Sequence, residues 1–303
     1  MSTLPTVIDA HHHYYNPGTN QFNAFLASLG AGPYSPADYA SASIGVDPKF
    51  TVHVECMPDD GGAGTGLQTR HRANHIHALD SFVDTQSLNS LTELMLLRVA
   101  VAEAAWVEEL VAAGECRVGA IVANCKLPRD TAASELSKLI AAAPKLLRGI
   151  RFILDYDGPF DGKNATHIAT TAPGYLVSDA SAPVDYLRDA AAAPLFERGF
   201  ALLAEHKLSF DLQCCPAQLP AAAALCARHP SVPVVVDHLG KPRHLAADGS
   251  DADRAALDEW RAGMELMAAL PQASCRDRTG CSPAAHPGCT HAAEARDVTR
   301  RCT

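Results

Sequence analysis

The feature that most constrains the fold is an alternation of short β-branched apolar runs with longer Ala- and Leu-rich segments along the 303 residues. Short apolar runs of this kind are typical of parallel strands that are buried on both faces. The expected strands cover residues 6–13, 50–57, 117–125, 147–154, 208–215 and 232–239. The expected helices cover residues 102–113, 132–142, 184–205, 217–228 and 252–270. The pattern predicts an α/β fold, a (β/α)8 TIM-like barrel that lacks its last two strands, with a doubly wound open sheet as the competing architecture.

Two segments depart from this rhythm. Residues 61–97 read as an insertion, because they interrupt a short passage from the second expected strand to the helix at 102–113. Their opening GGAGTG is not expected to bind phosphate, because no Lys-Ser/Thr pair follows the glycines. Residues 273–303 carry four cysteines and five arginines, and Val298 is their only Val, Ile or Leu. We therefore expect one barrel domain over residues 1–272 and a disordered Cys/Arg-rich tail over 273–303, which we interpret as a frameshift, splicing or gene-model product.

Composition excludes several classes of partner. Lys and Arg total 25 against 34 Asp and Glu, a formal net charge of -9, and no basic run could follow a phosphate backbone. No apolar stretch approaches the roughly 20 residues of a membrane span, and the N-terminus has no signal-peptide core. We expect a cytoplasmic protein that binds neither nucleic acid nor membrane. The cysteines expected to be reduced core residues are Cys56, Cys116, Cys125, Cys214, Cys215 and Cys226.

The first expected strand contains three consecutive histidines. Because side chains alternate along a strand, Asp9, His11 and His13 should share one face, while Ala10 and His12 take the other. Two imidazoles that project into one space at the end of a strand can hold a divalent metal or polarise a substrate oxygen. We predict that His11 and His13 are functional residues.

The second and fourth expected strands carry charged residues in apolar surroundings. His53 and Glu55 should share a face, and a buried carboxylate beside histidines often marks an acid/base or binding site. Arg151 can bind a carboxylate or lactone oxygen through two hydrogen bonds. Two alternatives stay open: Glu55 only orients a neighbouring side chain, or Arg151 forms a structural ion pair with Asp155 or Glu55.

The fifth expected strand has one polar face. Ser209, Asp211 and Gln213 alternate with apolar residues, which a polar barrel interior would explain. The adjacent Cys214 and Cys215 raise the alternative of a thiol nucleophile, although buried thiols are common core residues.

The sixth expected strand ends in Asp237, His238 and Lys241, at the end of the barrel where active sites are built. His238 is therefore a stronger functional candidate than a histidine on a helix. The histidines to which we assign no chemistry are His71, His75, His77, His206 and His229.

Taken together, these motifs resemble the amidohydrolase-related family (amidohydrolase 2). The motifs are HxH on the first strand, VHVE on the second, RGIR on the fourth, FDLQ on the fifth and DHLGKP on the sixth. The branch that they most resemble contains 2-pyrone-4,6-dicarboxylate lactonase and sugar-lactone hydrolases. The resemblance covers residues 6 to about 272 outside the insertion.

The resemblance implies a barrel of the metal-dependent hydrolase type, with its site at the C-terminal strand ends. His11 and His13 match the family's first-strand pair, and His238 matches its sixth-strand histidine. Relatives that decarboxylate or cleave amides use zinc or manganese. Here Gln213 stands where those relatives have a histidine, which favours the lactonase branch and a reaction without a required cofactor.

One family feature finds no match. The family places an aspartate after its eighth strand as general base, whereas Asp277 and Asp297 lie in sequence without strand character. The resemblance therefore leaves open whether this chain is active, and a truncated non-catalytic remnant is one alternative. The other is a metal-dependent decarboxylase or amidohydrolase.

The leading prediction is a lactone hydrolase acting on a small anionic or polyhydroxylated substrate, with a homo-oligomer left open. We expect His11, His13 and His238 to be catalytic, with His11 and His13 as the ligands if a divalent metal binds. The residues expected to bind substrate are Glu55, Arg151, Gln213 and Lys241.

Overall fold

The computed structural model describes residues 6–14, 34–56, 91–156, 184–242 and 249–275. The chain divides into two compact units, one formed by Met1–Lys126 and Asp130–Arg151 and the other by Leu127–Arg129 and Phe152–Thr303. We refer to them as unit 1 and unit 2.

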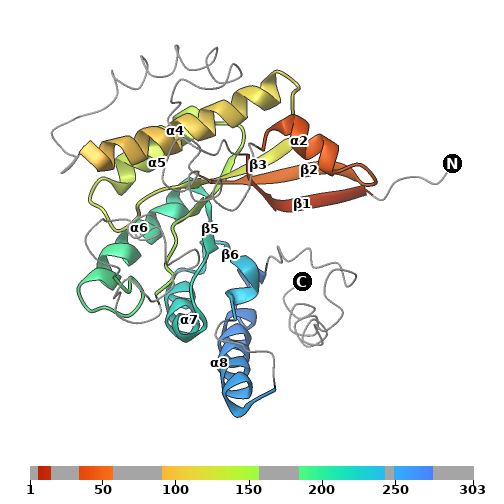
Figure 1. Ribbon diagram of the computed structural model, residues 1–303. Helices are drawn as coiled ribbons and strands as arrows, with labels where there is room; N and C mark the ends of the chain where they lie inside the picture. Colours follow the sequence, from red (N-terminus) through yellow and green to blue (C-terminus); the bar gives the residue numbers. More distant parts are fainter. Residues whose placement is uncertain (1–5, 15–33, 57–90, 157–183, 243–248, 276–303) are drawn as a thin grey trace. The chain divides into compact units, whose positions relative to one another are not determined.

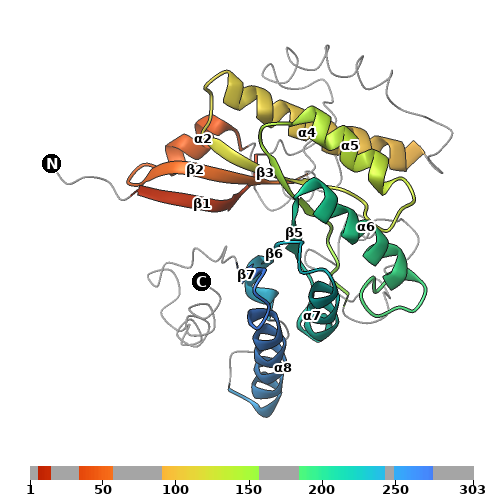
Figure 2. The same cartoon turned by 180° about the vertical axis from the view of Figure 1, so that it is seen from behind.

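Unit 1 contains a parallel sheet in the order β1-β2-β3-β4. Its strands are β1 (Thr6–His12), β2 (Asp47–Val54), β3 (Val118–Asn124) and β4 (Leu147–Arg151). Its helices are α2 (Pro36–Ala42), α4 (Leu91–Ala112) and α5 (Ala132–Ala142). Helices α4 and α5 lie side by side, as Figures 1 and 2 both show. Helices connect successive strands, which is the β-then-α order that the sequence predicts.

Helix α2 is not among the expected helices, although the sequence contains a signal for its N-terminus. The Ser35 hydroxyl accepts a hydrogen bond from the Asp38 backbone N–H at 3.3 Å, and the Asp38 carboxylate accepts from the Ser35 N–H at 2.8 Å. This reciprocal pair is a capping box, and Pro36 occupies the first turn, where its missing N–H costs nothing. The helix is only seven residues long, too short for its apolar spacing to be read.

Unit 2 contains the parallel strands β5 (Ser209–Leu212), β6 (Val234–Val236) and β7 (Ala273–Cys275). Its α-helices are α6 (Ala192–His206), α7 (Leu219–Arg228) and α8 (Asp251–Ala268), with 3-10 helices η2 (Pro216–Gln218) and η3 (Asp237–Gly240). Helices α7 and α8 lie side by side in Figures 1 and 2.

Aromatic packing joins α6 to β5 in unit 2. The ring of Phe210 on β5 lies 5.7 Å from the ring of Phe196 and 5.3 Å from that of Phe200, centroid to centroid. The three side chains are almost completely buried. A Cβ added to Gly199 on the same helix would lie 1.9 Å from the Leu127 carbonyl oxygen, so this close approach requires glycine.

Most expected strands and helices are found with limits shifted by one to several residues, and the three largest differences concern α4, α6 and β7. Helix α4 begins at Leu91, within the segment read as an insertion. Helix α6 begins at Ala192 rather than at residue 184, because the Asp189 carboxylate accepts the N–H groups of Ala191 and Ala192 at 2.9 and 2.8 Å and so marks the first turn.

The third difference is strand β7, which is additional to the six strands expected. It spans the first three residues of the segment read as a tail, and it pairs with Val234–Val236 of β6. Ala, Ser and Cys have little β propensity, so the pairing and not the local sequence makes this segment a strand. The expected disorder after residue 275 concerns residues outside the described ranges.

The cysteines in the described ranges are free thiols. Five of the six expected core cysteines are buried, and Cys116 is half-buried. Among the described residues, no helix combines the length and the low polarity that crossing a membrane requires.

Candidate active site

An imidazole pair lies at the end of β1. The Nε2 atoms of His11 and His13 are 3.2 Å apart, and the Nδ1 atom of His13 lies 2.7 Å from the Val54 carbonyl oxygen. Because a carbonyl oxygen only accepts, His13 Nδ1 carries the proton, and in the neutral ring Nε2 is an acceptor. His11 Nε2–H then donates to His13. The predicted convergence of these two side chains is confirmed, and the pair presents one donor and one acceptor.

Asp9 anchors the first member of this pair. Its Oδ1 accepts the His11 backbone N–H at 3.1 Å, and its Oδ2 accepts the Tyr39 hydroxyl of α2 at 2.9 Å. Burial, followed by the hydrogen bond to Asp9, raises the pKa of Tyr39 well above its ordinary value. Tyr39 therefore stays a donor at physiological pH and holds the start of the histidine run against α2.

The middle histidine takes the other side of the strand, as the alternation predicts. His12 Nε2 lies 2.8 Å from the Thr51 hydroxyl, and its ring meets that of His53 edge-on at 5.5 Å. Tyr14 stacks on His53 at 5.5 Å between ring centroids. These residues are buried. They form a packed cluster between β1 and β2 rather than part of the imidazole pair.

His53 pairs with a residue that the sequence reasoning missed. Its Nε2 lies 2.8 Å from Oε1 of Glu103, a buried residue of α4. Burial, with the charge of Arg151 as a smaller cause, lowers the pKa of His53 to about 3. His53 is therefore neutral near pH 7 and donates to the carboxylate. Glu103 lies within a continuous helix, where a single glutamate gives no sequence signal of burial.

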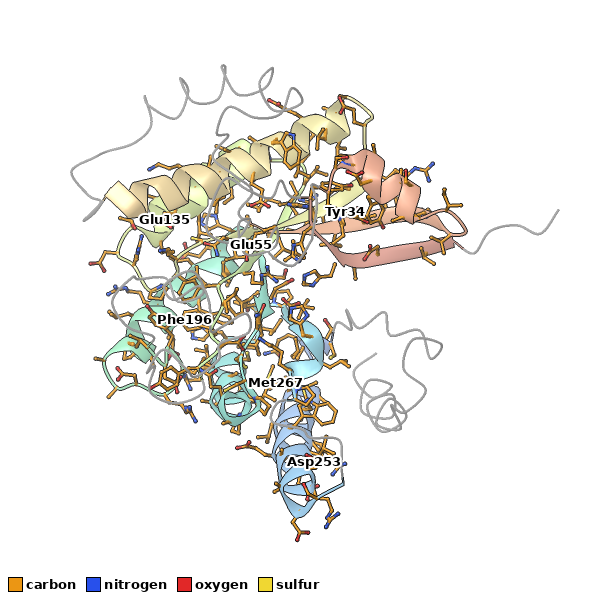
Figure 3. The ribbon with its side chains drawn as sticks, viewed as in Figure 1. Tyr34, Glu55, Glu135, Phe196, Asp253 and Met267 are labelled. Atoms are coloured by element: carbon orange, nitrogen blue, oxygen red, sulfur yellow. The ribbon has the colours of Figure 1, made fainter. Side chains whose placement is uncertain are left out.

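Glu55 and Arg151 form a buried ion pair. Arg151 Nε and Nη2 each lie 2.9 Å from Glu55 Oε1, and Nη2 also donates to the Glu55 carbonyl oxygen at 2.8 Å. Both side chains are almost completely buried, and Figure 3 labels Glu55 just past the end of β2. The ion-pair alternative for Arg151 is thus confirmed with Glu55 as the partner. Substrate binding by the two residues stays a prediction.

In unit 2, Asp155 joins two of the predicted substrate-binding residues. Its Oδ2 accepts a hydrogen bond from Gln213 Nε2 at 3.1 Å and forms an ion pair with Lys241. Asp155 and Gln213 are fully buried. Sequence reasoning named Asp155 only as an alternative partner of Arg151, because its distance of 86 residues from Lys241 leaves no local signal.

The turn that carries His238 and Lys241 has an unusual backbone. His238, Leu239, Gly240 and Lys241 all have left-handed φ angles, from 49° to 66°. Left-handed conformations cost about 1 kcal/mol or more per non-glycine residue and tend to persist at functional sites. Helix α8 holds the turn through the Trp260 indole N–H, which donates to the Leu239 carbonyl oxygen at 2.6 Å. The predicted catalytic role of His238 stays a prediction.

The thiol alternative finds no support. Cys214 is buried, and burial, followed by the charge of Asp155, raises the pKa of its thiol well above the ordinary value. A catalytic cysteine requires the opposite shift, since the thiolate is the nucleophile.

The imidazole pair partly fits a metal. Two nitrogens bound to tetrahedral zinc at about 2.0–2.1 Å would lie about 3.3 Å apart, close to the observed 3.2 Å. The hydrogen bond from His13 Nδ1 to a backbone carbonyl is the usual support of a histidine ligand. However, within the described ranges no group of three or more His, Cys, Asp or Glu side chains could hold a metal ion. These residues alone do not make a complete metal site.

Several predicted features lie outside the described residues. Among them are Asp277 and Asp297, which do not match the family's base motif, and the histidines of the segment at 61–90.

Comparison with known proteins gives matches along most of the chain. The family model described as amidohydrolase matches residues 8–287. A segment of 81 residues is 41% identical to an L-fucono-1,5-lactonase of Burkholderia multivorans, and one of 83 residues is 32% identical to that of Burkholderia ambifaria. Each segment covers 27% of this chain and only 26% of the relative, so the chain spans about a quarter of these curated relatives.

Two solved structures resemble this one along nearly its whole length. Both are an amidohydrolase of Burkholderia multivorans, one with bound HEPES (TM-score 0.56, 22% identity) and one with bound zinc (TM-score 0.52, 21% identity). Each comparison covers 97% of this chain and 79% of the other. The likeness confirms the fold class predicted from the sequence, an α/β fold related to the hydrolase barrels.

Proposed function

The chain belongs to the amidohydrolase family, and from this premise we propose that it hydrolyses a lactone of a sugar acid. In this reaction the oxygen of a water molecule bonds to the lactone carbonyl carbon and the ring C–O bond breaks. The ring oxygen takes up a proton, and the product is an open-chain hydroxy acid. The family resemblance on which the sequence prediction rested is confirmed, whereas the lactone is our proposal.

The observation that carries the proposal is the imidazole pair. The Val54 carbonyl holds His13 with its proton on Nδ1, so the two facing Nε2 atoms are one donor and one acceptor. His11 Nε2–H can donate to the carbonyl oxygen of the lactone as negative charge develops on that oxygen. His13 Nε2 can accept the proton of the attacking water. A positioned donor or base of this kind contributes roughly 10²–10⁴ in rate.

The ion pair in the unit that holds the imidazole pair favours a polyhydroxylated substrate over a carboxylated one. Arg151 is paired there with the buried Glu55. A cation whose charge is already balanced attracts a substrate carboxylate less strongly, whereas hydroxyl groups can still bond to both partners of an ion pair. The L-fucono-1,5-lactonases that match part of the chain act on a substrate of this class by name.

The proposal is tested with the purified full chain and a panel of lactones. The panel contains sugar 1,5-lactones, with 2-pyrone-4,6-dicarboxylate as the carboxylated comparison, and hydrolysis is followed by proton release above the spontaneous rate. We expect turnover of one or more sugar lactones and a loss of about 100-fold or more in His13→Ala. The matched control is His206→Ala, which removes an exposed histidine at the end of α6 and should leave the rate unchanged.

Two outcomes count against the proposal. If the wild-type chain hydrolyses no lactone above the spontaneous rate, the proposed function is wrong. If wild type and His13→Ala have equal rates, the imidazole pair is not catalytic. The metal-dependent alternative is tested by assaying after dialysis against a chelator, where a loss of activity that zinc restores would transfer the polarising role to a metal.

A further inference from the structure

The segment just after β2 is held from the helix side by one atom. Oε1 of Glu103 accepts the Cys56 backbone N–H at 2.9 Å and faces the ring nitrogen Nε2 of His53 at 2.8 Å. Glu103 and His53 are buried, so neither bond is exchanged for water. A carboxylate that accepts two buried donors forms stronger hydrogen bonds than a neutral acceptor does.

The two bonds flank the group that orients His13. Val54 lies between His53 and Cys56, and its carbonyl oxygen is the acceptor for His13 Nδ1 at 2.7 Å. On the sheet side, the next residue is fixed by its own N–H, which donates to the Val122 carbonyl at 2.8 Å. A rotation of the 54–55 peptide plane would point the Val54 carbonyl away from His13. Glu103 opposes that rotation by holding both ends of the segment.

We propose that Glu103 is a positioning residue, which fixes the Val54 carbonyl and thereby keeps His13 in the tautomer with its proton on Nδ1. The inference rests on the proposed function for its catalytic meaning, because that tautomer makes His13 Nε2 the acceptor toward water. Glu103 acts on His13 through the Val54 carbonyl that lies between its two donors, His53 and Cys56.

The test compares Glu103→Met with Glu103→Gln in the full chain. Both hydrogen bonds end on Oε1, so the glutamine carbonyl oxygen can accept both of them, whereas methionine has a similar volume and accepts neither. The direct readout is the ¹⁵N spectrum of histidine-labelled protein, in which protonated and unprotonated ring nitrogens are well separated. The His13 signals are assigned by their absence in His13→Gln.

We expect wild type and Glu103→Gln to show His13 with its proton on Nδ1, and Glu103→Met to show a mixture of the two tautomers. Lactone turnover should follow, with kcat lower by about tenfold or more in Glu103→Met and KM within about twofold. An unchanged His13 spectrum in Glu103→Met would overturn the inference.

The matched control is Glu135→Met. Glu135 is also a buried helix glutamate that accepts a backbone N–H beyond a strand end, here that of Lys126 at 3.4 Å. It should leave both the His13 spectrum and kcat unchanged. A His13 spectrum that mixes tautomers in Glu135→Met as well would reduce the effect to general loosening and overturn the specific role.

Two further provisions keep the outcome decisive. If Glu103→Met does not unfold cooperatively, His53→Leu replaces it, since that change removes one of the two bonds. A partial mixture then supports the role of Glu103, and a wild-type tautomer overturns it. If the wild-type chain hydrolyses no lactone, the proposed function fails, while the spectra still decide whether Glu103 sets the tautomer.

Discussion

The ends of β2 and β3 are anchored in the same way but lead to different surroundings. In each case a buried glutamate of the following helix accepts the backbone N–H two residues past the strand. Glu103 of α4 binds the N–H of Cys56, and Glu135 of α5 binds that of Lys126. Figure 3 labels Glu135 on its helix and Glu55 at the end of β2. The repeated βα unit thus repeats a polar anchor as well as its apolar packing.

What differs is the set of groups that each anchor reaches. Glu135 also accepts the hydroxyl of Thr131 at 2.7 Å and the Cys125 thiol at 3.8 Å, and neither donor is an imidazole. Glu103 binds the ring of His53, and the carbonyl between its two donors orients His13. The same kind of glutamate anchor therefore bears on the candidate site only at the end of β2, because the Val54 carbonyl between its two donors orients His13.

The largest expected effect comes from breaking the ion pair that only the β2 end has. Glu55→Leu removes the carboxylate and leaves the Arg151 guanidinium buried, which should lower the free energy of unfolding by about 3–5 kcal/mol. Urea unfolding followed by circular dichroism measures the loss.

The control for this change is the double variant Glu55→Leu/Arg151→Met, in which no charge is left without its partner. It should recover a large part of the lost stability, because a buried ion pair replaced by apolar groups of similar size costs little. A double variant as unstable as the single one would show that the loss comes from packing and not from charge.

The second effect is a pH dependence that the β2 end alone should confer. The pKa of His53 is about 3 in the folded protein and near 6.5 in the unfolded chain, so the unfolded state binds more protons between these values. The contribution of His53 is therefore complete above pH 6.5 and declines as the pH falls toward 3, by up to about 1.4 kcal/mol per pH unit.

Urea unfolding at several pH values in this window measures the slope. His53→Phe should flatten it, while Glu135→Met, at the β3 end, should keep it. If the slope is the same with and without His53, another group is responsible.

A smaller effect is expected from the β3 anchor itself. Thr131→Val removes the hydroxyl that donates to Glu135 Oε1, which should lower the free energy of unfolding by about 1 kcal/mol. Lactone hydrolysis should not change, because nothing at this anchor orients the imidazole pair. A loss of turnover that matches Glu103→Met would remove the distinction between the two strand ends.

The smallest effect concerns a helix glutamate that is partly exposed. Glu197 of α6 binds Arg228 at 2.7 Å and His229 at 2.9 Å, and the hydrogen bond from Arg228 is the main cause that lowers its pKa to about 2. This contribution is complete above pH 4.5 and declines as the pH falls toward 2. Because solvent screens the pair, Glu197→Gln should cost less than about 1 kcal/mol at pH 7. Thermal unfolding at pH 7 measures the cost, and a larger loss would show that exposed and buried helix glutamates are alike here.

Much of the candidate site could be predicted because its signals are local. Alternation along a strand placed His11 and His13 on one side and His12 on the other, since the side-chain period of two holds for any strand. The partners Glu103 and Asp155 could not be predicted in their roles. They lie 50 and 86 residues from His53 and Lys241, and only the fold brings them into contact.

The sequence by itself determined the alternation of strands and helices, the family and the convergence of the imidazole pair, because each depends on short-range periodicity or on motif spacing. Tertiary structure decided which groups became partners. It paired Arg151 with Glu55 and Lys241 with Asp155, made Ala273–Cys275 a strand through β6, and kept His53 neutral. The physical reason is that burial and ion pairing depend on atoms that are close in space, whatever their distance along the chain.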